Sequence, residues 1–209
     1  LPETPMSVIP SRPSMTVPIH RITCNGTPLP AASQLIALDT TQAIDRVGTA
    51  SLRFVAVAAD RTWDDLLKEV PLDAMLEIAL GHGAQADTVF IGTVHAHRLL
   101  LADGGAPEIV LDAATPSAFS AASDDVTVIA QYGADLLAPD IARTLDDAGA
   151  IRLQGQAILA GTARALPGNR LALQGVADAF GGTYYIDAVH HHFDREGWTS
   201  RFDIRADAR

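Results

Sequence analysis

The sequence predicts a mainly β protein built from small antiparallel barrels or sandwiches. The strongest signal is in residues 180–205, where two runs rich in β-branched and aromatic residues flank a short polar turn. A second block, residues 19–112, repeats short apolar runs separated by glycine-containing turns. Both patterns are typical of antiparallel sheets whose strands follow one another closely along the chain.

The composition fits one sizeable core or two small ones. The chain has 209 residues, of which 48% are hydrophobic and 19% charged. Its formal net charge of −10 disfavours direct binding to nucleic acid, which depends on Lys and Arg displacing counterions. The single cysteine, Cys24, offers no disulfide partner and no zinc-ligand spacing. No run of about 18 apolar residues is visible, so we expect no membrane span. No export signal is visible either, so we expect the protein to assemble in the cytoplasm.

The first seventeen residues are expected to form an extended arm. Residues 1–18 hold five of the twelve prolines and show no apolar periodicity. Such an arm is a candidate for wrapping a neighbouring molecule.

The block that follows alternates strands with one helix. A turn is expected at Asn25-Gly26, and residues 62–70 place apolar side chains at helical spacing behind the candidate cap Thr62. Strands are expected at residues 19–24, 35–38, 50–58, 74–80, 88–97 and 108–112.

A linker with one short helix is predicted for residues 114–149. Apolar signals are weak up to residue 138. From there Pro139 to Gly149 reads as a helix, with proline in its first turn and glycine as its stop.

The final block is predicted to hold about four strands. Pro167-Gly168 suits the centre of a type II turn. Residues 180–194 and 198–205 form the two arms of a hairpin, closed by Asp194-Arg-Glu-Gly197. Alternation in the second arm assigns one face to Trp198, Ser200, Phe202 and Ile204, and the other to Thr199, Arg201, Asp203 and Arg205.

These motifs carry a resemblance to a known family. The segment PGNRLALQGV followed by FGGTYYIDAVHHHFDREGWTSRFDIR resembles the end of the hub domain shared by VgrG spike proteins, phage late control protein D and the tail hubs of contractile phages. The resemblance extends, more weakly, over residues 15–115. It implies two hub-type barrels, at residues 18–113 and 150–209. Full-length hubs usually insert another α/β segment between the barrels, and this chain has no room for one.

The resemblance also implies a function. A structural baseplate hub of a phage tail or contractile injection system is expected to form a homotrimer, whose six barrels make a pseudo-sixfold ring between a sixfold tail tube and a threefold spike. Expected partners are a separate spike protein and the tail tube protein, with tape measure and other baseplate proteins as further candidates. The expected location is the tail baseplate.

We expect the contacts to come from the C-terminal hairpin. Its outward strand, Thr199 to Arg205, is expected to pair with a neighbour by edge addition. The predicted contact residues are His190, His192, Trp198, Thr199, Arg201, Asp203 and Arg205.

The histidines also suggest a competing reading. Alternate residues of a strand share a face, so His95 with His97, or His190 with His192, would be able to chelate a metal ion. Neither pair has a third ligand at fixed spacing, which favours a structural or interface role.

No enzyme is predicted. The chain has no Gly-x-Ser-x-Gly elbow and no nucleophile with a base and an orienting group, so we expect no catalytic residue, cofactor or metal ion. Two alternatives remain: a monomeric carbohydrate-binding or adhesin-like β module, which needs an exposed aromatic platform, and a metal-dependent hydrolase built on the histidine clusters.

Overall fold

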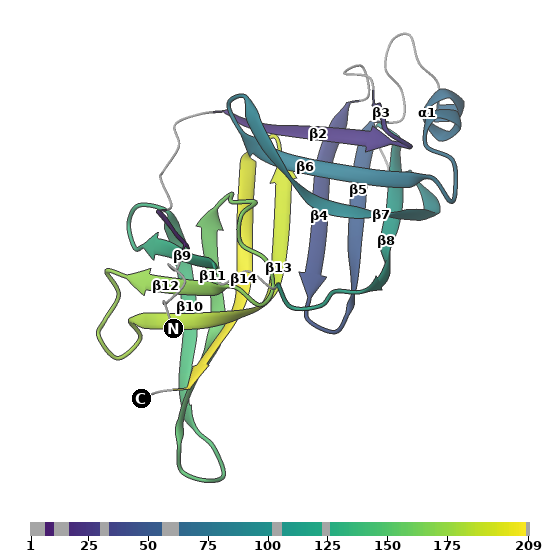
Figure 1. Cartoon of the computed structure of the whole chain (residues 1–209). Coiled ribbons are helices and arrows are strands. Elements are labelled where there is room, and N and C mark those ends of the chain that lie inside the picture. The colour runs from purple at the N-terminus through teal and green to yellow at the C-terminus, as the bar shows by residue number, and fades with distance from the viewer. Residues whose placement is uncertain are drawn as a thin grey trace.

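The computed structural model is mainly β, as the sequence predicts (Figure 1). It describes residues 7–10, 17–29, 34–55, 63–101, 106–122 and 126–207. In these ranges the one helix is α1 (Trp63–Glu69). The strands are β1 (Ser7–Pro10), β2 (Pro18–Cys24), β3 (Thr27–Pro28), β4 (Leu35–Ala43), β5 (Val47–Val55), β6 (Met75–His82), β7 (Gln85–Leu100), β8 (Glu108–Ala118), β9 (Val126–Gln131), β10 (Leu136–Leu145), β11 (Ile151–Ala160), β12 (Arg170–Gln174), β13 (Gly182–Asp194) and β14 (Gly197–Asp207).

The strands form two curled units that lie side by side (Figure 1). The first unit contains β2 to β8 with α1, and the second contains β9 to β14. Strand pairing gives the order β4-β5-β8-β7-β6-β2-β3 in the first unit. In the second, β9-β12-β13 continues into β14, β11 and β10, and β1 adds to β9 in parallel.

The two units repeat one pairing scheme. The antiparallel order β4-β5-β8-β7-β6 recurs as β10-β11-β14-β13-β12, with each strand in the same sequence order. Irregularities in the pairing recur as well. Ile36 in β4 and Leu137 in β10 have no opposite residue in the neighbouring strand. The same is true of His95 in β7 and Asp187 in β13. Each is a β-bulge, which changes the direction of its strand. The chain is therefore a structural duplication that its sequence hides.

The turns before β6 and β12 share a positive backbone φ and an equivalent hydrogen bond. Asp73 and Gly168 both take positive φ, 64° and 96°. Their amides donate to the carbonyls of Val94 and Ile186, the residues just before the two bulges. The second of these turns contains the predicted Pro167-Gly168 pair, closed by the hydrogen bond from the Asn169 amide to the Leu166 carbonyl.

Each unit surrounds its own apolar core, and the C-terminal hairpin contributes to both cores. The first core includes Leu38, Leu52, Phe54, Leu76, Ile78, Phe90 and Leu111. The second includes Leu136, Leu159, Leu171, Tyr184, Ile186, Phe202 and Ile204. The tip of the hairpin crosses over, because Trp198 belongs to the first core and Phe193 packs against it.

Strand β13 joins the units by changing partners. Its start pairs with β12, and after the bulge at Asp187 the same edge pairs with β4, from Ala188 opposite Ala43 to Asp194 opposite Ala37. The amide of Ile44 donates to the Asp187 carbonyl at this point. We call the pairing of Ala37–Ala43 with Ala188–Asp194 the internal junction.

The local predictions have mixed outcomes. The hairpin, its turn and the helix near residues 62–70 are confirmed. The helix predicted at residues 139–149 is wrong: the stretch forms most of β10 and a turn. Proline is tolerated on an edge strand, and the Asp146 carboxylate accepts hydrogen bonds from the Ala148 and Ala150 amides, so the same proline and glycine serve a hairpin. The predicted linker, 114–149, contains the end of β8 and the strands β9 and β10. Of the predicted arm, residues 7–10 form β1, while residues 1–6 and 11–16 lie outside the described ranges.

Candidate functional site: the outer face of the internal junction

The predicted alternation of β14 is confirmed. Ser200, Phe202 and Ile204 are buried, whereas Arg201 and Arg205 are exposed and Thr199 and Asp203 are half-buried. Trp198 is only 5% exposed. Six of the seven predicted contact residues therefore reach the surface, and Trp198 is a core residue.

The idea that β14 pairs with a neighbour by its edge is wrong. Strand β14 is hydrogen-bonded to β11 on one side and to β13 on the other along most of its length. Its outward side chains remain available, but its backbone is not. The sequence alone could not reveal this, because it does not show which strands lie at the margins of a sheet.

His190 and His192 face outward from β13 and cross the internal junction. His190 Nδ1 lies 3.1 Å from Thr41 Oγ1, and its Nε2 lies 3.2 Å from the Asp203 carboxylate. His192 Nδ1 lies 2.6 Å from the Asp39 carboxylate, and its Nε2 lies 3.3 Å from that of Asp194. Both imidazoles thus contact the first unit through one nitrogen and the hairpin through the other.

The two carboxylates set the protonation of His192. Partial burial alone would lower the pKa of His192, but the hydrogen bonds and charges of Asp39 and Asp194 outweigh it and raise that pKa above its ordinary value. The junction therefore holds a charged imidazole between two carboxylates at slightly acidic pH. In the described part of the chain, no three His, Cys, Asp or Glu side chains are grouped so as to hold a metal ion.

His191 points the other way, into the protein. Its Nδ1 lies 2.8 Å from the hydroxyl oxygen of Ser200, and its ring lies 5.7 Å from that of Trp198. Burial, and then the charge of His190, lowers the pKa of His191 to about 3, so it is neutral at physiological pH. Ser200 is fully buried, so this serine and histidine have no access to a substrate.

The bulge in β7 separates His95 from His97, the other candidate metal-binding pair. His95 is the bulged residue and is exposed, whereas His97 lies opposite Leu111, a core residue. The two imidazoles therefore do not share a face as regular alternation would require. Next to them, Arg98 Nε donates to the Asp112 carboxylate at 2.6 Å.

Two surface residues that lie beside the predicted contact Arg205, namely Tyr185 and Arg170, could not be identified from the sequence. Tyr185 is 48% exposed on β13, with Arg170 directly opposite on β12 and Arg205 opposite on β14. Their guanidinium carbons lie 5.6 and 5.9 Å from the centre of the tyrosine ring, within the range of cation–π contacts. Arg205 also donates to the Asp187 carboxylate at 2.8 Å. The pattern becomes visible only once the register of three strands is known.

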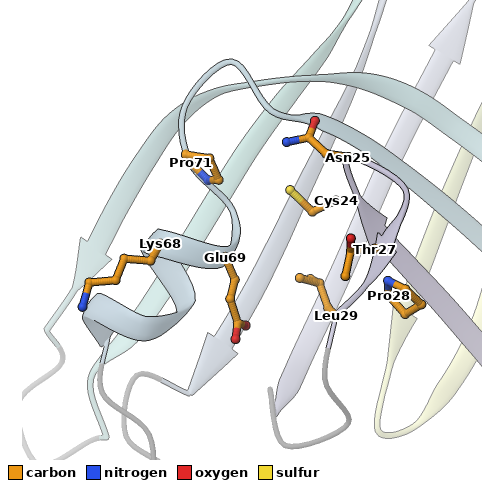
Figure 2. A pocket seen from close by; sticks show the side chains of 8 residues that line it. All are labelled: Cys24, Asn25, Thr27, Pro28, Leu29, Lys68, Glu69 and Pro71. Atoms are coloured by element: carbon orange, nitrogen blue, oxygen red, sulfur yellow. The ribbon is translucent and has the colours of Figure 1, made fainter.

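A pocket of about 330 Å³ lies at the far end of the first unit, between α1 and the β2–β3 turn (Figure 2). Its lining residues are Cys24, Asn25, Thr27, Pro28, Leu29, Lys68, Glu69 and Pro71. Burial raises the pKa of the Cys24 thiol, which disfavours the reactive thiolate. Asn25 and Gly26 both take positive φ, which confirms the predicted turn. The pocket offers a contact surface, and its one thiol is poorly suited to act as a nucleophile.

No helix in the described ranges has the length and apolar character needed to span a membrane. No model of a known protein family matches the chain, and a search of curated proteins also finds no match.

Solved structures, in contrast, share its fold. The tail protein from Neisseria meningitidis MC58 superposes with a TM-score of 0.60 at 8% sequence identity, covering 91% of this chain and 97% of that one. The 43 kDa tail protein of prophage MuSo2 from Shewanella oneidensis gives 0.57 at 7% identity, covering 88% and 95%. A type VI secretion system component of E. coli, described as structurally similar to the T4 bacteriophage tail proteins gp27 and gp5, gives 0.53 at 10% identity, covering 90% and 77%. The chain thus shares its fold with two tail proteins and with a component of a type VI secretion system.

Proposed function

We propose that this chain is the structural baseplate hub of a phage tail or contractile injection system, related to VgrG and phage late control protein D. Three copies form a ring of six similar units, which adapts a sixfold tail tube to a threefold spike. The observation that carries the proposal is the shared fold, which covers about nine-tenths of this chain in each comparison. The internal duplication supports it, because two similar units in each copy are what a threefold ring needs to present sixfold contacts.

The proposed partners are those expected from the sequence: further copies of this chain, a separate spike protein and the tail tube protein. The outward side chains of the hairpin are the proposed contacts with these partners, namely His190, His192, Thr199, Arg201, Asp203 and Arg205. The two units are the proposed barrel domains, with assembly in the cytoplasm and a final place in the baseplate. The role is structural and not enzymatic.

Solution mass tests the proposal. Multi-angle light scattering over a concentration series should show a species of three times 22.0 kDa, about 66 kDa. A mass of 22.0 kDa at every concentration, unchanged by adding spike or tube protein from the same system, would contradict it. Electron microscopy of the same sample should show rings with a central channel.

A further inference from the structure

A single sheet runs through the whole molecule, and at each end one strand has an edge without a partner strand among the described residues. Its order is β10-β11-β14-β13-β4-β5-β8-β7, and every neighbouring pair in it is antiparallel. At one end β10 has β11 as its only long partner among the described residues. At the other, β7 pairs with β6 only as far as Thr93, so within the described ranges the edge of residues 96–100 has no partner strand.

The internal duplication shows what these two edges correspond to. Strand β10 occupies the place that β4 occupies in the first unit. Residues 96–100 follow the bulge in β7 just as Ala188–Asp194 follow the bulge in β13. In the internal junction these two equivalents are paired with each other. Each copy therefore carries both halves of a second junction, at opposite ends of its sheet.

We propose that β10 of one copy pairs antiparallel with residues 96–100 of β7 in the next copy, repeating the internal junction between molecules. The antiparallel alternation continues without a break across this contact, because β10 runs opposite to β7 as β4 runs opposite to β13. Transferring the register of the internal junction places Leu99 opposite Ile141 of the next copy, Arg98 opposite Ala142 and Leu100 opposite Asp140.

The side chains at the β7 edge fit a covered surface. Leu99, Leu100 and Leu101 are consecutive and are 44%, 37% and 69% exposed. Their equivalents in the second unit are His191, His192 and Phe193. Of these, His191 is buried, Phe193 packs against the first core, and His192 stays exposed but contacts Asp39 of the first unit. A run of three exposed leucines in a chain with a net charge of −10 is unusual for a free surface and typical of an interface.

The β10 edge fits as well. Ile141 packs against the second core, and Ala142 is small and exposed. Pro139, which would meet Leu101, cannot donate a backbone hydrogen bond, so that pair would be a side-chain contact and the ladder would run through residues 140–144. An edge strand that carries exposed apolar residues is a template for pairing with another chain.

The inference rests on the proposed ring and specifies its contact. A head-to-tail contact between unlike edges closes when the rotation per copy divides a full turn. If the proposed pairing between copies turns the chain by the same angle as the internal junction, three copies complete six equal steps and leave neither edge without a partner.

Disulfide trapping tests the register. In a Cys24→Ser background, Leu100→Cys with Asp140→Cys places two thiols opposite each other, as His192 and Asp39 are at the internal junction. Mild oxidation should give dimer and trimer bands on a denaturing gel, and a reductant should remove them. The matched control is Leu100→Cys with Ile141→Cys, because a shift of one residue turns the second thiol to the other face of β10. A trimer in solution without these bands, or with stronger bands in the control, would overturn the inference.

A charge substitution tests the same contact without a cross-link. Leu99→Glu should weaken the trimer by about 100-fold or more, because it buries an unpaired carboxylate. Leu72→Glu, at a leucine that is 54% exposed, against 44% for Leu99, and lies outside the proposed contact, should leave the trimer intact. Circular dichroism would show that both variants remain folded. A trimer that resists Leu99→Glu contradicts this interface alone, whereas a wild-type protein that is always monomeric contradicts the ring itself.

Discussion

His192 Nδ1 lies 2.6 Å from the carboxylate of Asp39, and this contact joins the C-terminal hairpin to the first unit. The two residues are far apart in sequence, and they are directly opposite each other in the pairing of β13 with β4. Asp194 approaches the same ring from the other side at 3.3 Å. The contact therefore links the stability of the internal junction to the protonation of one histidine.

The first prediction concerns His192→Gln. Because the folded pKa of His192 is raised, its stabilising effect is complete below the unfolded value near 6.5 and is lost as pH rises through the folded pKa. The substitution should lower the free energy of unfolding at pH 5.5 by only about 0.5 kcal/mol, since the pair is half-exposed and screened, and by less at pH 8. Urea denaturation at the two pH values measures this difference. An effect independent of pH would show that the ion pair is not its cause.

The second prediction concerns His191→Phe, which keeps a ring beside Trp198 but removes the titrating group. The folded pKa of His191 is depressed to about 3, so above pH 6.5 the residue is neutral in both the folded and the unfolded state. As pH falls from 6.5 towards 3, only the unfolded state takes up the proton, and the free energy of unfolding falls. Between pH 7.5 and 4.5, the wild type should lose about 2–3 kcal/mol more than the variant, at about 1.4 kcal/mol per unit below 6.5. Parallel acid dependence of the two proteins would contradict the burial of an uncharged imidazole.

The third prediction concerns the packing of Trp198. A Cβ at Gly161 would overlap the indole ring, so Gly161→Ala should destabilise the protein by about 1–3 kcal/mol or more. Gly181→Ala is the matched control, because its nearest neighbour would lie 3.8 Å away and neither glycine has a positive φ. Thermal denaturation of both variants measures the difference. Equal melting temperatures would mean that Trp198 is not fixed in the first core.

The fourth prediction concerns the tip of the β10–β11 hairpin, which extends away from the body of the molecule (Figure 1). The Asp146 carboxylate accepts hydrogen bonds from the Ala148 and Ala150 amides and from Arg152, and these bonds lower its pKa. Asp146→Ala should speed proteolytic cleavage within residues 146–150 while leaving the melting temperature nearly unchanged. Asp147→Ala, at the exposed neighbouring position, should leave the cleavage rate near that of the wild type. A rate unchanged by Asp146→Ala would show that these bonds do not order the turn.

Sequence periodicity was sufficient where one face of a strand is buried. The alternation of Trp198, Ser200, Phe202 and Ile204 predicts the inward face of β14 correctly, because a barrel wall imposes a period of two. It failed for β10, which extends past the core and so has few buried residues to mark its pattern. In that stretch, proline and glycine were the strongest local signals, and both fit a helix or a hairpin.

The candidate site was predictable only in part. The outward residues of β13 and β14 could be named from alternation, but Asp39, Thr41, Arg170 and Tyr185 could not be assigned to them. Their contacts depend on which strands pair and in which register, and these are properties of the whole sheet. The internal duplication was equally hidden, because the two units share hydrogen-bonding pattern and bulge positions far more than they share side chains.

The crossing of the hairpin tip into the first core has a consequence for biosynthesis. The residues of the first unit leave the ribosome well before Phe193 and Trp198, which complete its interior. Until those residues are made, the first core lacks two apolar side chains and one edge of β4 has no partner strand, and both features favour misassembly. The first core is therefore complete only once synthesis has passed residue 198.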